Sequence, residues 1–332
     1  MNAETQFIRR PTDSAAWLET IRPFIGGSEV AALCNASRFK TPIDLFLAKT
    51  GRAPDDEPQD ADAALRLLRG QHDESLVAEE YTRRTGRQVR NYGYIVTRGH
   101  ARADVDRLVV PDGEKVASFH EEVRAAGILE CKVSDSTDWD EDEPPIYYAA
   151  QVQLYMELLD LPWADIAAIL TKPRFRFKLY HVERDRAIGA ELVRRIEAFW
   201  HDAIIPDDVE AASAFVRNLA DARTLFPHGG GEAKEADPDT AGRIRALRKT
   251  EADIKALTAH ADNLKGEVAA FMGDADALTL DGVKLCTFKA PKPRRVTDWK
   301  AVAADLHAPA ELVAAHTVEQ PGARRFLLCA EK

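Results

Sequence analysis

The segment Gly127-Ile128-Leu129-Glu130-Cys131-Lys132-Val133-Ser134 decides the fold that the sequence predicts. Its apolar and β-branched residues predict a short buried strand, in which successive side chains point to opposite faces. Glu130 and Lys132 are two residues apart, so both side chains lie on the same face. A carboxylate and an ammonium group on one face of a buried strand suggest a chemical role.

A second predicted strand, residues 101–110, lies upstream and carries the carboxylates Asp104 and Asp106. Together the two segments form the pattern D…E-x-K. In a chain with 30% charged residues this spacing also arises by chance, and a salt bridge between strands is the plain alternative. Asp104 and Asp106 would face the same way on one strand, so the residues alone leave both as candidates.

Hydrolysis of a phosphodiester would give these side chains a common purpose. The reaction needs an activated water and stabilisation of negative charge on the phosphoryl group and on the leaving oxygen, and a divalent metal ion meets these needs. Mg²⁺ prefers carboxylate and carbonyl oxygens, which Asp106, Glu130 and the backbone carbonyl of Cys131 offer. Lys132 would hold or deprotonate the attacking water, and Glu74 would add an acid from a neighbouring helix.

The composition describes a globular chain without a membrane segment. Its 332 residues, 45% of them hydrophobic, suffice for one large and one smaller domain. No apolar run approaches the roughly 20 residues that cross a bilayer. The start Met1-Asn2-Ala3-Glu4 lacks a signal pattern. We therefore expect a cytoplasmic protein with no membrane partner.

The cysteines and the net charge argue against some classes of protein. Cys34, Cys131, Cys286 and Cys329 have no C-x-x-C spacing, which argues against a zinc ribbon or an iron–sulfur cluster. A formal net charge of −10 argues against a protein coated with nucleic acid. Local DNA binding stays open, because acids gathered at a metal site contribute to the same total.

The patterns of helix, strand and turn residues predict an α/β domain at residues 1–225, a linker at 226–239 and a carboxy-terminal extension at 240–332. The domain has five predicted strands, at residues 88–97, 101–110, 127–134, 165–171 and 175–183. Its helices are predicted at residues 13–22, 42–49, 63–85, 146–159 and 192–200. This order predicts a mixed sheet with helices packed over it.

The extension is predicted to contain a charged helix at residues 240–272 and a β-hairpin at 278–289, which turns at Asp281-Gly282. A basic patch at 289–295 and a last strand at 324–328 follow. A coiled-coil or packing role is expected for the helix.

The turn Gly26-Gly27-Ser28 opens another predicted helix. Free backbone N–H groups and the helix dipole make such a turn suited to an anion. An ordinary N-cap role for Ser28 is the alternative.

Several motifs, in order over about 200 residues, resemble the YqaJ-type viral recombinase family, which is related to the phage lambda exonuclease. They are Ile25–Leu33, Lys40–Gly51, Gly70–Glu74, Arg102–Arg107, Leu129–Lys132, Tyr148–Met156 and Glu197–Trp200. The chain after residue 240 is similar, more loosely, to the carboxy-terminal extension of some phage members.

The resemblance implies an α/β fold with a restriction-endonuclease-like PD-(D/E)XK core, whose mixed central sheet is flanked by helices, and a smaller α+β extension. It implies a nuclease, dependent on Mg²⁺ with Mn²⁺ as a substitute, that degrades one strand of duplex DNA from the 5′ end. Family members act in a bacterial cytoplasm for a phage or prophage. The implied partners are double-stranded DNA ends, a single-strand annealing protein and further copies of the chain, as in a ring of three subunits.

The resemblance also assigns roles to residues. Asp106 and Glu130 match the metal ligands of the family, and Lys132 matches its catalytic lysine. Glu74 matches the acid on the preceding helix, and Gln151 matches the glutamine that follows the core. The match of Asp106-Arg107-Leu108-Val109 to the family favours Asp106 over Asp104 as the ligand.

Two further residues, Arg22 and Ser28, resemble those that bind the terminal 5′ phosphate in the family. This assignment agrees with the anion-binding turn described above, although the spacing between the two residues only approximates the family pattern. Ser75 also departs from the family, which commonly has proline after the helix acid.

Two alternatives to an exonuclease follow from the same features. An endonuclease or nickase could use the same core, because neither the fold nor a metal site determines where a strand is cut. A non-catalytic DNA-binding or assembly subunit could use the carboxy-terminal helix and basic patch. The intact D…E-x-K pattern argues against this last class, since buried acids repel one another and need a reason to be kept.

Overall fold

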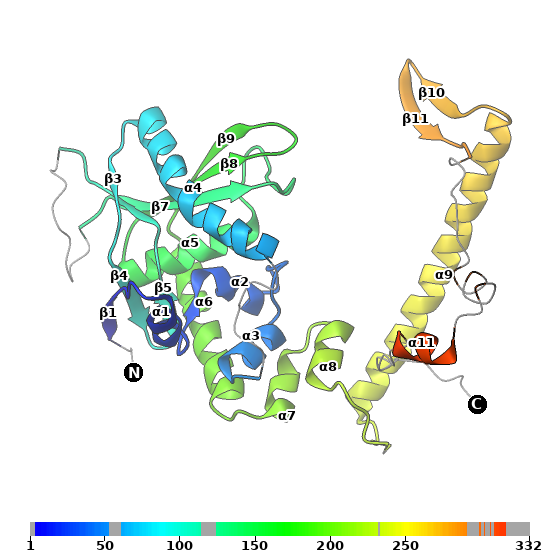
Figure 1. Cartoon of the computed structure of the whole chain (residues 1–332), viewed down its shortest axis with the longest axis horizontal. Coiled ribbons are helices and arrows are strands. Elements are labelled where there is room, and N and C mark those ends of the chain that lie inside the picture. Colours follow the sequence, from blue (N-terminus) through cyan, green and yellow to red (C-terminus); the bar gives the residue numbers. More distant parts are fainter. Residues whose placement is uncertain are drawn as a thin grey trace. The chain divides into compact units, whose positions relative to one another are not determined.

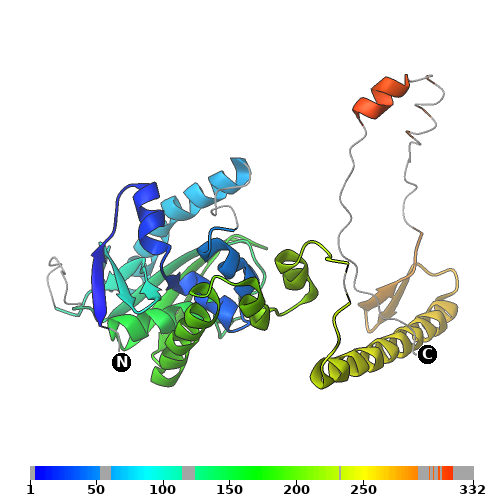
Figure 2. The ribbon, with the colours of Figure 1, turned by 90° about the horizontal axis from the view of Figure 1, so that it is seen from below.

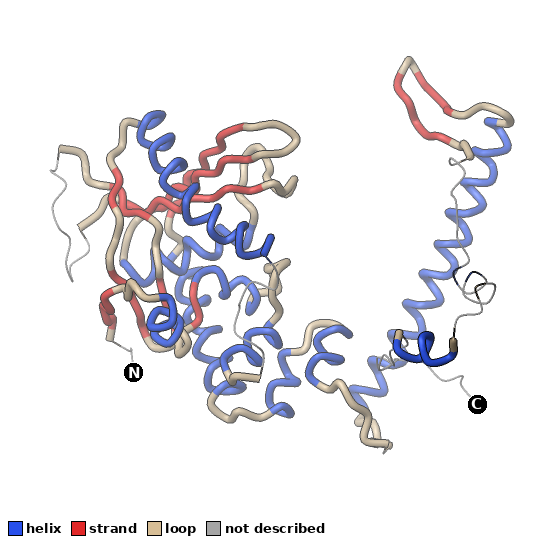
Figure 3. Tube along the Cα trace, in the orientation of Figure 1, coloured by secondary structure: helices blue, strands red, loops and turns tan. Residues whose placement is uncertain are grey.

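The computed structural model describes residues 4–52, 61–113, 124–231 and 233–290, and residues 299, 302, 306 and 309–316. The chain divides into two compact units, residues 1–227 and 228–332. Figures 1 and 3 show helices and strands intermixed in the first unit, and a long helix with a hairpin in the second.

The larger of two sheets in the first unit has the strand order β3-β6-β7-β8-β9. Its strands are β3 (Val89–Arg90), β6 (Arg107–Val109), β7 (Gly127–Ser134), β8 (Trp163–Leu170) and β9 (Arg176–Glu183). Only β7 and β8 among neighbouring strands run parallel, so the sheet is mixed. The predicted strand that carries Glu130 and Lys132 is confirmed and lies at the centre.

A second, smaller sheet has the order β1-β4-β5-β2. It consists of β1 (Thr5–Arg9), β4 (Tyr94–Arg98), β5 (Ala101–Ala103) and β2 (Ile25–Gly26). Strands β4 and β5 form a hairpin, and the short β2 joins β5 in parallel.

The two long strands predicted at residues 88–97 and 101–110 are wrong. Each segment is divided between the two sheets, because the chain leaves regular structure at residues 91–93 and again at 104–106. The interruptions are Asn91-Tyr92-Gly93 and Asp104-Val105-Asp106, and strands are depleted in Asn, Gly and Asp. The second interruption places both candidate aspartates outside a strand.

Helices cover both faces of the larger sheet (Figure 1). Helix α4 (Ala61–Thr85) packs on one face, where Tyr81 belongs to the same apolar cluster as Leu129. Helix α5 (Ile146–Leu159) packs on the other face, on the side of Ile128. The alternation of β7 therefore sends Glu130 and Lys132 toward α5.

The remaining helices of the first unit include several that match their predicted ends. Thr41 caps the helix that begins at Pro42, the predicted start, and its side chain accepts a hydrogen bond from the Asp44 amide at 3.3 Å. Gly86 has φ of +74° just after α4, as expected for a helix end. The other helices are α1 (Ser14–Ile21), α2 (Gly27–Leu33), α3 (Pro42–Lys49), α6 (Arg186–Phe199), α7 (Val209–Ala212) and α8 (Leu219–Leu225).

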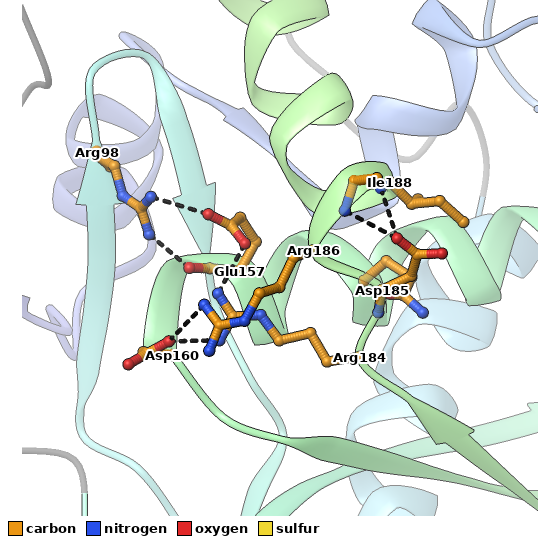
Figure 4. A network of polar contacts seen from close by, with 9 residues as sticks. Arg98, Glu157, Asp160, Arg184, Asp185, Arg186 and Ile188 are labelled. Carbon is orange, nitrogen blue, oxygen red and sulfur yellow. Dashed lines mark hydrogen bonds and ion pairs between the residues drawn. The ribbon is translucent and has the colours of Figure 1, made fainter.

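A network of ion pairs joins the hairpin β4–β5 to the ends of two helices (Figure 4). The guanidinium of Arg98 on β4 lies 3.1 Å from Glu157 near the end of α5. Arg184, just before α6, lies 2.7 Å from the same carboxylate and also pairs with Asp160. Since Glu157 and Arg184 are largely shielded from solvent, this network fixes how α5 and α6 meet the hairpin.

The second unit begins with helix α9 (Pro238–Met272), and the hairpin of β10 (Ala277–Leu280) and β11 (Val283–Thr287) follows (Figures 1 and 2). Asp281 and Gly282 at its turn have φ of +50° and +79°, which a two-residue turn of this kind requires. A short helix, α11 (Ala310–Ala315), lies further on. Most of the predicted basic patch and the whole predicted strand at 324–328 lie outside the described residues.

No helix in the described part of the chain combines the length and the apolar character needed to cross a membrane.

Candidate active site

Strand β6 begins only at Arg107, so it leaves the edge of β7 beyond Leu129 without a partner strand. Strand β6 pairs with β7 only from Val109, opposite Gly127, to Arg107, opposite Leu129. The Cys131 amide therefore donates not to a strand but to the carboxylate of Asp106, at 2.8 Å. Because the N–H and C=O of a strand residue point to the same side, the Cys131 carbonyl also points toward this open edge. One carboxylate and one peptide edge are thus brought together.

Asp104 points to different partners from Asp106. It forms an ion pair with Arg10 and lies 3.5 Å from the guanidinium of Arg102. The expectation that Asp104 and Asp106 face the same way is wrong, because residues 104–106 are not in a strand. Of the two aspartates, Asp106 is the one that contacts the backbone of β7.

Glu130 is the most buried carboxylate of the site, with 1% of its side chain exposed. Its Oε1 forms an ion pair with Lys132 and accepts a hydrogen bond from the Gln151 amide at 2.6 Å. Its Oε2 is buried and has no hydrogen-bond partner among the described residues. Burial, together with the charge of Asp106, raises the pKa of Glu130 to about 8, and the nearby Lys132 only partly offsets this.

Lys132 keeps its proton in this environment. Burial alone would lower its pKa, but the charges of Glu130 and Asp106 outweigh burial and raise the pKa above its ordinary value. The Nζ atom also lies 5.0 Å from the centre of the Tyr148 ring, a cation–π contact. Of the two roles expected for Lys132, holding a water by donation fits this charge state better than taking a proton from it.

Gln151 is buried on α5, so it must find partners for its amide. Its Nε2 lies 2.6 Å from Glu130 and 3.1 Å from the hydroxyl of Tyr155. A small residue on α2 leaves space for this arrangement: a Cβ atom at Gly27 would lie 2.7 Å from Gln151 and 2.5 Å from the Tyr155 ring. The structure therefore places Gln151 against the carboxylate that the sequence predicted as a metal ligand.

Glu74 borders the site from helix α4. Its carboxylate lies 3.9 Å from Arg107, and it lines a pocket of about 380 Å³ together with Asp106 and Trp17. Burial, with the charge of Asp106, raises the pKa of Glu74. Glu74, Asp106 and Glu130 do not bring three ligand oxygens within 4.8 Å of one another in this structure. Asp106 therefore contacts β7 directly, whereas Glu74 lies beside Asp106 at the border of the site.

Arg22 and Ser28 both lie on exposed surface, Arg22 just after α1 and Ser28 in the first turn of α2. The alternative that Ser28 is the N-cap is wrong, since Gly26 occupies that position. The Gly26 amide already donates to the Glu29 carboxylate at 2.9 Å, so one of the amides expected to bind an anion is occupied.

Arg102 is a buried cation beside this turn that the sequence interpretation missed. A Cβ atom at Gly26 would lie 2.4 Å from its guanidinium, which also faces the Trp17 ring at 6.0 Å. The Gly26-Gly27 pair was a signal for such close approach, but nothing local pointed to Arg102 as the neighbour.

The oxygen atoms at the open edge of β7 fit a hard divalent cation. Two carboxylates and a peptide carbonyl are the ligand types that Mg²⁺ prefers. The buried Glu130 Oε2, which lacks a hydrogen-bond partner among the described residues, is costly unless a further group contacts it. The residues present therefore fit a metal held by Asp106, Glu130 and the Cys131 carbonyl.

A mixed sheet with helices on both faces carries an acid and a lysine two residues apart on a central strand, beside a second acid. This arrangement agrees with the PD-(D/E)XK core that the family resemblance implies. Residues 16–160 match the model of the YqaJ-like viral recombinase domain, which confirms the family resemblance. The protein YqaJ of Bacillus subtilis (strain 168), described as uncharacterised, is 27% identical over 287 residues, which cover 81% of this chain and 82% of that protein.

Two solved structures are also similar to this chain. The alkaline exonuclease LHK-Exo from Laribacter hongkongensis has a TM-score of 0.45 and 18% identity, and the match covers 60% of this chain and 100% of that one. A phage-related exonuclease from Haemophilus somnus 129PT has a TM-score of 0.41 and 12% identity, and the match covers 55% and 96% of the two chains.

Proposed function

We propose that this protein is a Mg²⁺-dependent deoxyribonuclease that degrades one strand of duplex DNA from its 5′ end. Mn²⁺ substitutes for Mg²⁺ in this proposal, and the single-stranded product serves recombination of phage or prophage DNA in a bacterial cytoplasm. The observation that supports it most is the buried Glu130 oxygen without a hydrogen-bond partner among the described residues, next to Asp106 and a protonated Lys132.

The side chains of the site divide the chemistry among them. A bound Mg²⁺ supplies positive charge for the phosphoryl oxygens and lowers the pKa of a coordinated water. Asp106 and Glu130 hold the cation, and the Cys131 amide fixes the orientation of Asp106. Lys132 donates to the attacking water and to developing negative charge. Gln151 holds Glu130 in place through its 2.6 Å contact.

The preference for a 5′ end is assigned to Arg22 and Ser28 by the family resemblance. Both are exposed, so a terminal phosphate can reach them from solvent. The partners proposed for the chain are duplex ends, a single-strand annealing protein that takes up the product, and other copies of the chain, arranged as a ring of three.

A nuclease assay with matched aspartate variants tests the proposal. The untagged chain is given linear duplexes with and without a 5′ phosphate, and closed circular DNA, each in Mg²⁺ and in EDTA. We expect Mg²⁺-dependent loss of the phosphorylated linear strand, its abolition in Lys132→Ala and Asp106→Asn, and near-normal rates in Asp104→Asn. Asp104→Asn is the matched control, because it removes the same charge two residues away.

Three results would contradict parts of the proposal. Cutting of the circular DNA would indicate an endonuclease or nickase. Activity that is lost in Asp104→Asn but kept in Asp106→Asn would overturn the assignment of the ligand. DNA binding without any cleavage that depends on Lys132 would indicate a non-catalytic assembly subunit.

A further inference from the structure

Two histidines and a glutamate meet on the first unit, outside the proposed nuclease site. His100 belongs to the turn between β4 and β5, Glu197 to the last turns of α6, and His201 to a turn of π-helix (Trp200–Ile204) that continues α6. Their three ligand atoms lie within 4.8 Å of one another. Among the described residues, no other group of three His, Cys, Asp or Glu side chains meets this distance.

The distances in this group suit a small tetrahedral cation. The Nδ1 atom of His100 lies 2.8 Å from the Glu197 carboxylate, and the Nε2 atom of His201 lies 3.7 Å from the same oxygen. In a tetrahedral zinc site with bonds of about 2.0–2.1 Å, neighbouring ligand atoms are about 3.3 Å apart. The observed separations lie on either side of this value, so small side-chain movements would complete the geometry.

The side chains are also held in place by their surroundings. The His100 backbone amide donates to the second Glu197 oxygen at 2.7 Å, and the His100 ring stacks on Trp200 with 4.6 Å between ring centres. Gly99 has φ of +58°, and a Cβ atom there would lie 2.2 Å from the Glu197 carboxylate. Glycine is therefore needed for this close approach, and these contacts orient the ligands before any metal binds.

The group is open to solvent on one side. The exposed fractions of the side chains are 28% for His100, 30% for Glu197 and 61% for His201. Water can therefore reach a metal and fill a fourth position. Two imidazoles and one carboxylate favour zinc and similar transition metals, whereas Mg²⁺ prefers oxygen ligands alone.

We propose that His100, Glu197 and His201 form a binding site for a divalent transition metal ion, with Zn²⁺ as the expected ion. The ion would cross-link the β4–β5 turn to the junction between α6 and the π-helical turn. The site is separate from the proposed nuclease function, and neither depends on the other.

Zn²⁺ titration of the untagged full-length chain tests the proposal. The protein is first stripped with a chelator and then titrated in excess Mg²⁺, which occupies sites made of oxygen alone, against a chromophoric zinc chelator. We expect one tight equivalent of Zn²⁺, a Zn²⁺-dependent rise in Tm, and visible absorption of a tetrahedral or five-coordinate site when Co²⁺ replaces Zn²⁺.

The variants His201→Ala and Glu197→Gln should weaken Zn²⁺ binding by about 100-fold or more, since even residues outside the ligand set change metal affinity by about 10- to 100-fold. His260→Ala removes an exposed histidine from α9 and is the matched control. His201 is mostly exposed, so its loss leaves the fold intact, and circular dichroism checks this. Zn²⁺ affinity that is unchanged in His201→Ala, or lost equally in His260→Ala, would overturn the proposal, as would a wild-type chain that binds no Zn²⁺.

Discussion

Glu130 is a carboxylate whose surroundings oppose its charge. Its pKa in the folded protein is raised to about 8, against an ordinary value near 4.3 in an unfolded chain. The folded state thus keeps a proton that the unfolded state has released. In the metal-free protein this makes the free energy of unfolding fall as the pH rises from about 4.5 to about 8.

This shift predicts that stabilisation by Mg²⁺ depends on pH. A cation must displace the proton of Glu130 at pH 6 but not above pH 8, so the apparent Mg²⁺ affinity should rise up to about tenfold per pH unit in this range. We expect a larger Mg²⁺-induced rise in Tm at pH 8.5 than at pH 6, measured by thermal unfolding. Glu130→Gln is the control and should lose both the rise and its pH dependence. An equal rise at both pH values in the wild type would show that Glu130 does not bind the ion.

The residue types of the site were predictable from the sequence, whereas their partners were not. The alternation of a strand placed Glu130 and Lys132 on one face, and β7 confirms this. The contact of Asp106 with the Cys131 amide joins residues 25 positions apart and depends on where β6 begins. Likewise, His100 and Glu197 are 97 positions apart, so only the fold reveals that they meet.

Among the elements, those with clear end signals were predicted best. Helix α3 has a capping Thr41 and Pro42 at its start, and α5 spans the predicted residues 146–159. The segments 88–97 and 101–110 had strand-like residues throughout, and no local pattern shows that one predicted strand will serve two sheets. The division of each segment is decided by packing between distant parts of the chain.

The packing of α2 against α5 predicts the effect of one methyl group. Gly27→Ala would place a Cβ atom 2.5 Å from the Tyr155 ring and 2.7 Å from Gln151, and crowding of this kind costs about 1–3 kcal/mol. We expect a lower free energy of unfolding in urea and, because Gln151 is pushed from Glu130, a lower kcat for the proposed DNA hydrolysis.

Gly266→Ala is the matched control for this change. Gly266 also lies within a helix, α9, but a Cβ atom there has no neighbour within 4 Å. The change should leave stability the same or raise it by about 0.5–1 kcal/mol, since alanine favours a helix over glycine. If Gly27→Ala were as harmless as Gly266→Ala, the close packing of α2 on Gln151 would be refuted.

At the scale of the whole molecule, the residues proposed for the nuclease site all belong to the unit of residues 1–227. This unit has its own apolar core, which includes residues of α2, α3, α5, β8 and α6. The general organisation, a larger α/β part followed by a helix and a hairpin, was predictable because each element is long or ends in a clear turn. The sequence does not predict what helix α9 contacts, since its apolar spacing fits both a coiled coil and packing on another surface.

We predict that a chain ending at Pro227 folds by itself. Its thermal unfolding should stay cooperative, with the Tm of this unit within about 4 °C of its value in the full chain, a change that corresponds to about 1 kcal/mol in a domain of this size. Mg²⁺-dependent cleavage of short linear duplexes should also be kept. A shortened chain without a cooperative transition would show that the second unit is needed for the fold of the first.

Strand β6 is three residues long, and this brevity sets a limit on how the protein can change. If an insertion let β6 begin two residues earlier, its backbone would form hydrogen bonds with the peptide group of Cys131 and displace Asp106 from it. The sheet would gain a backbone hydrogen bond and become more regular, while the proposed cation site would be closed. Natural variation that lengthens this strand should therefore yield stable proteins without the proposed activity. Selection for that activity should keep β6 short.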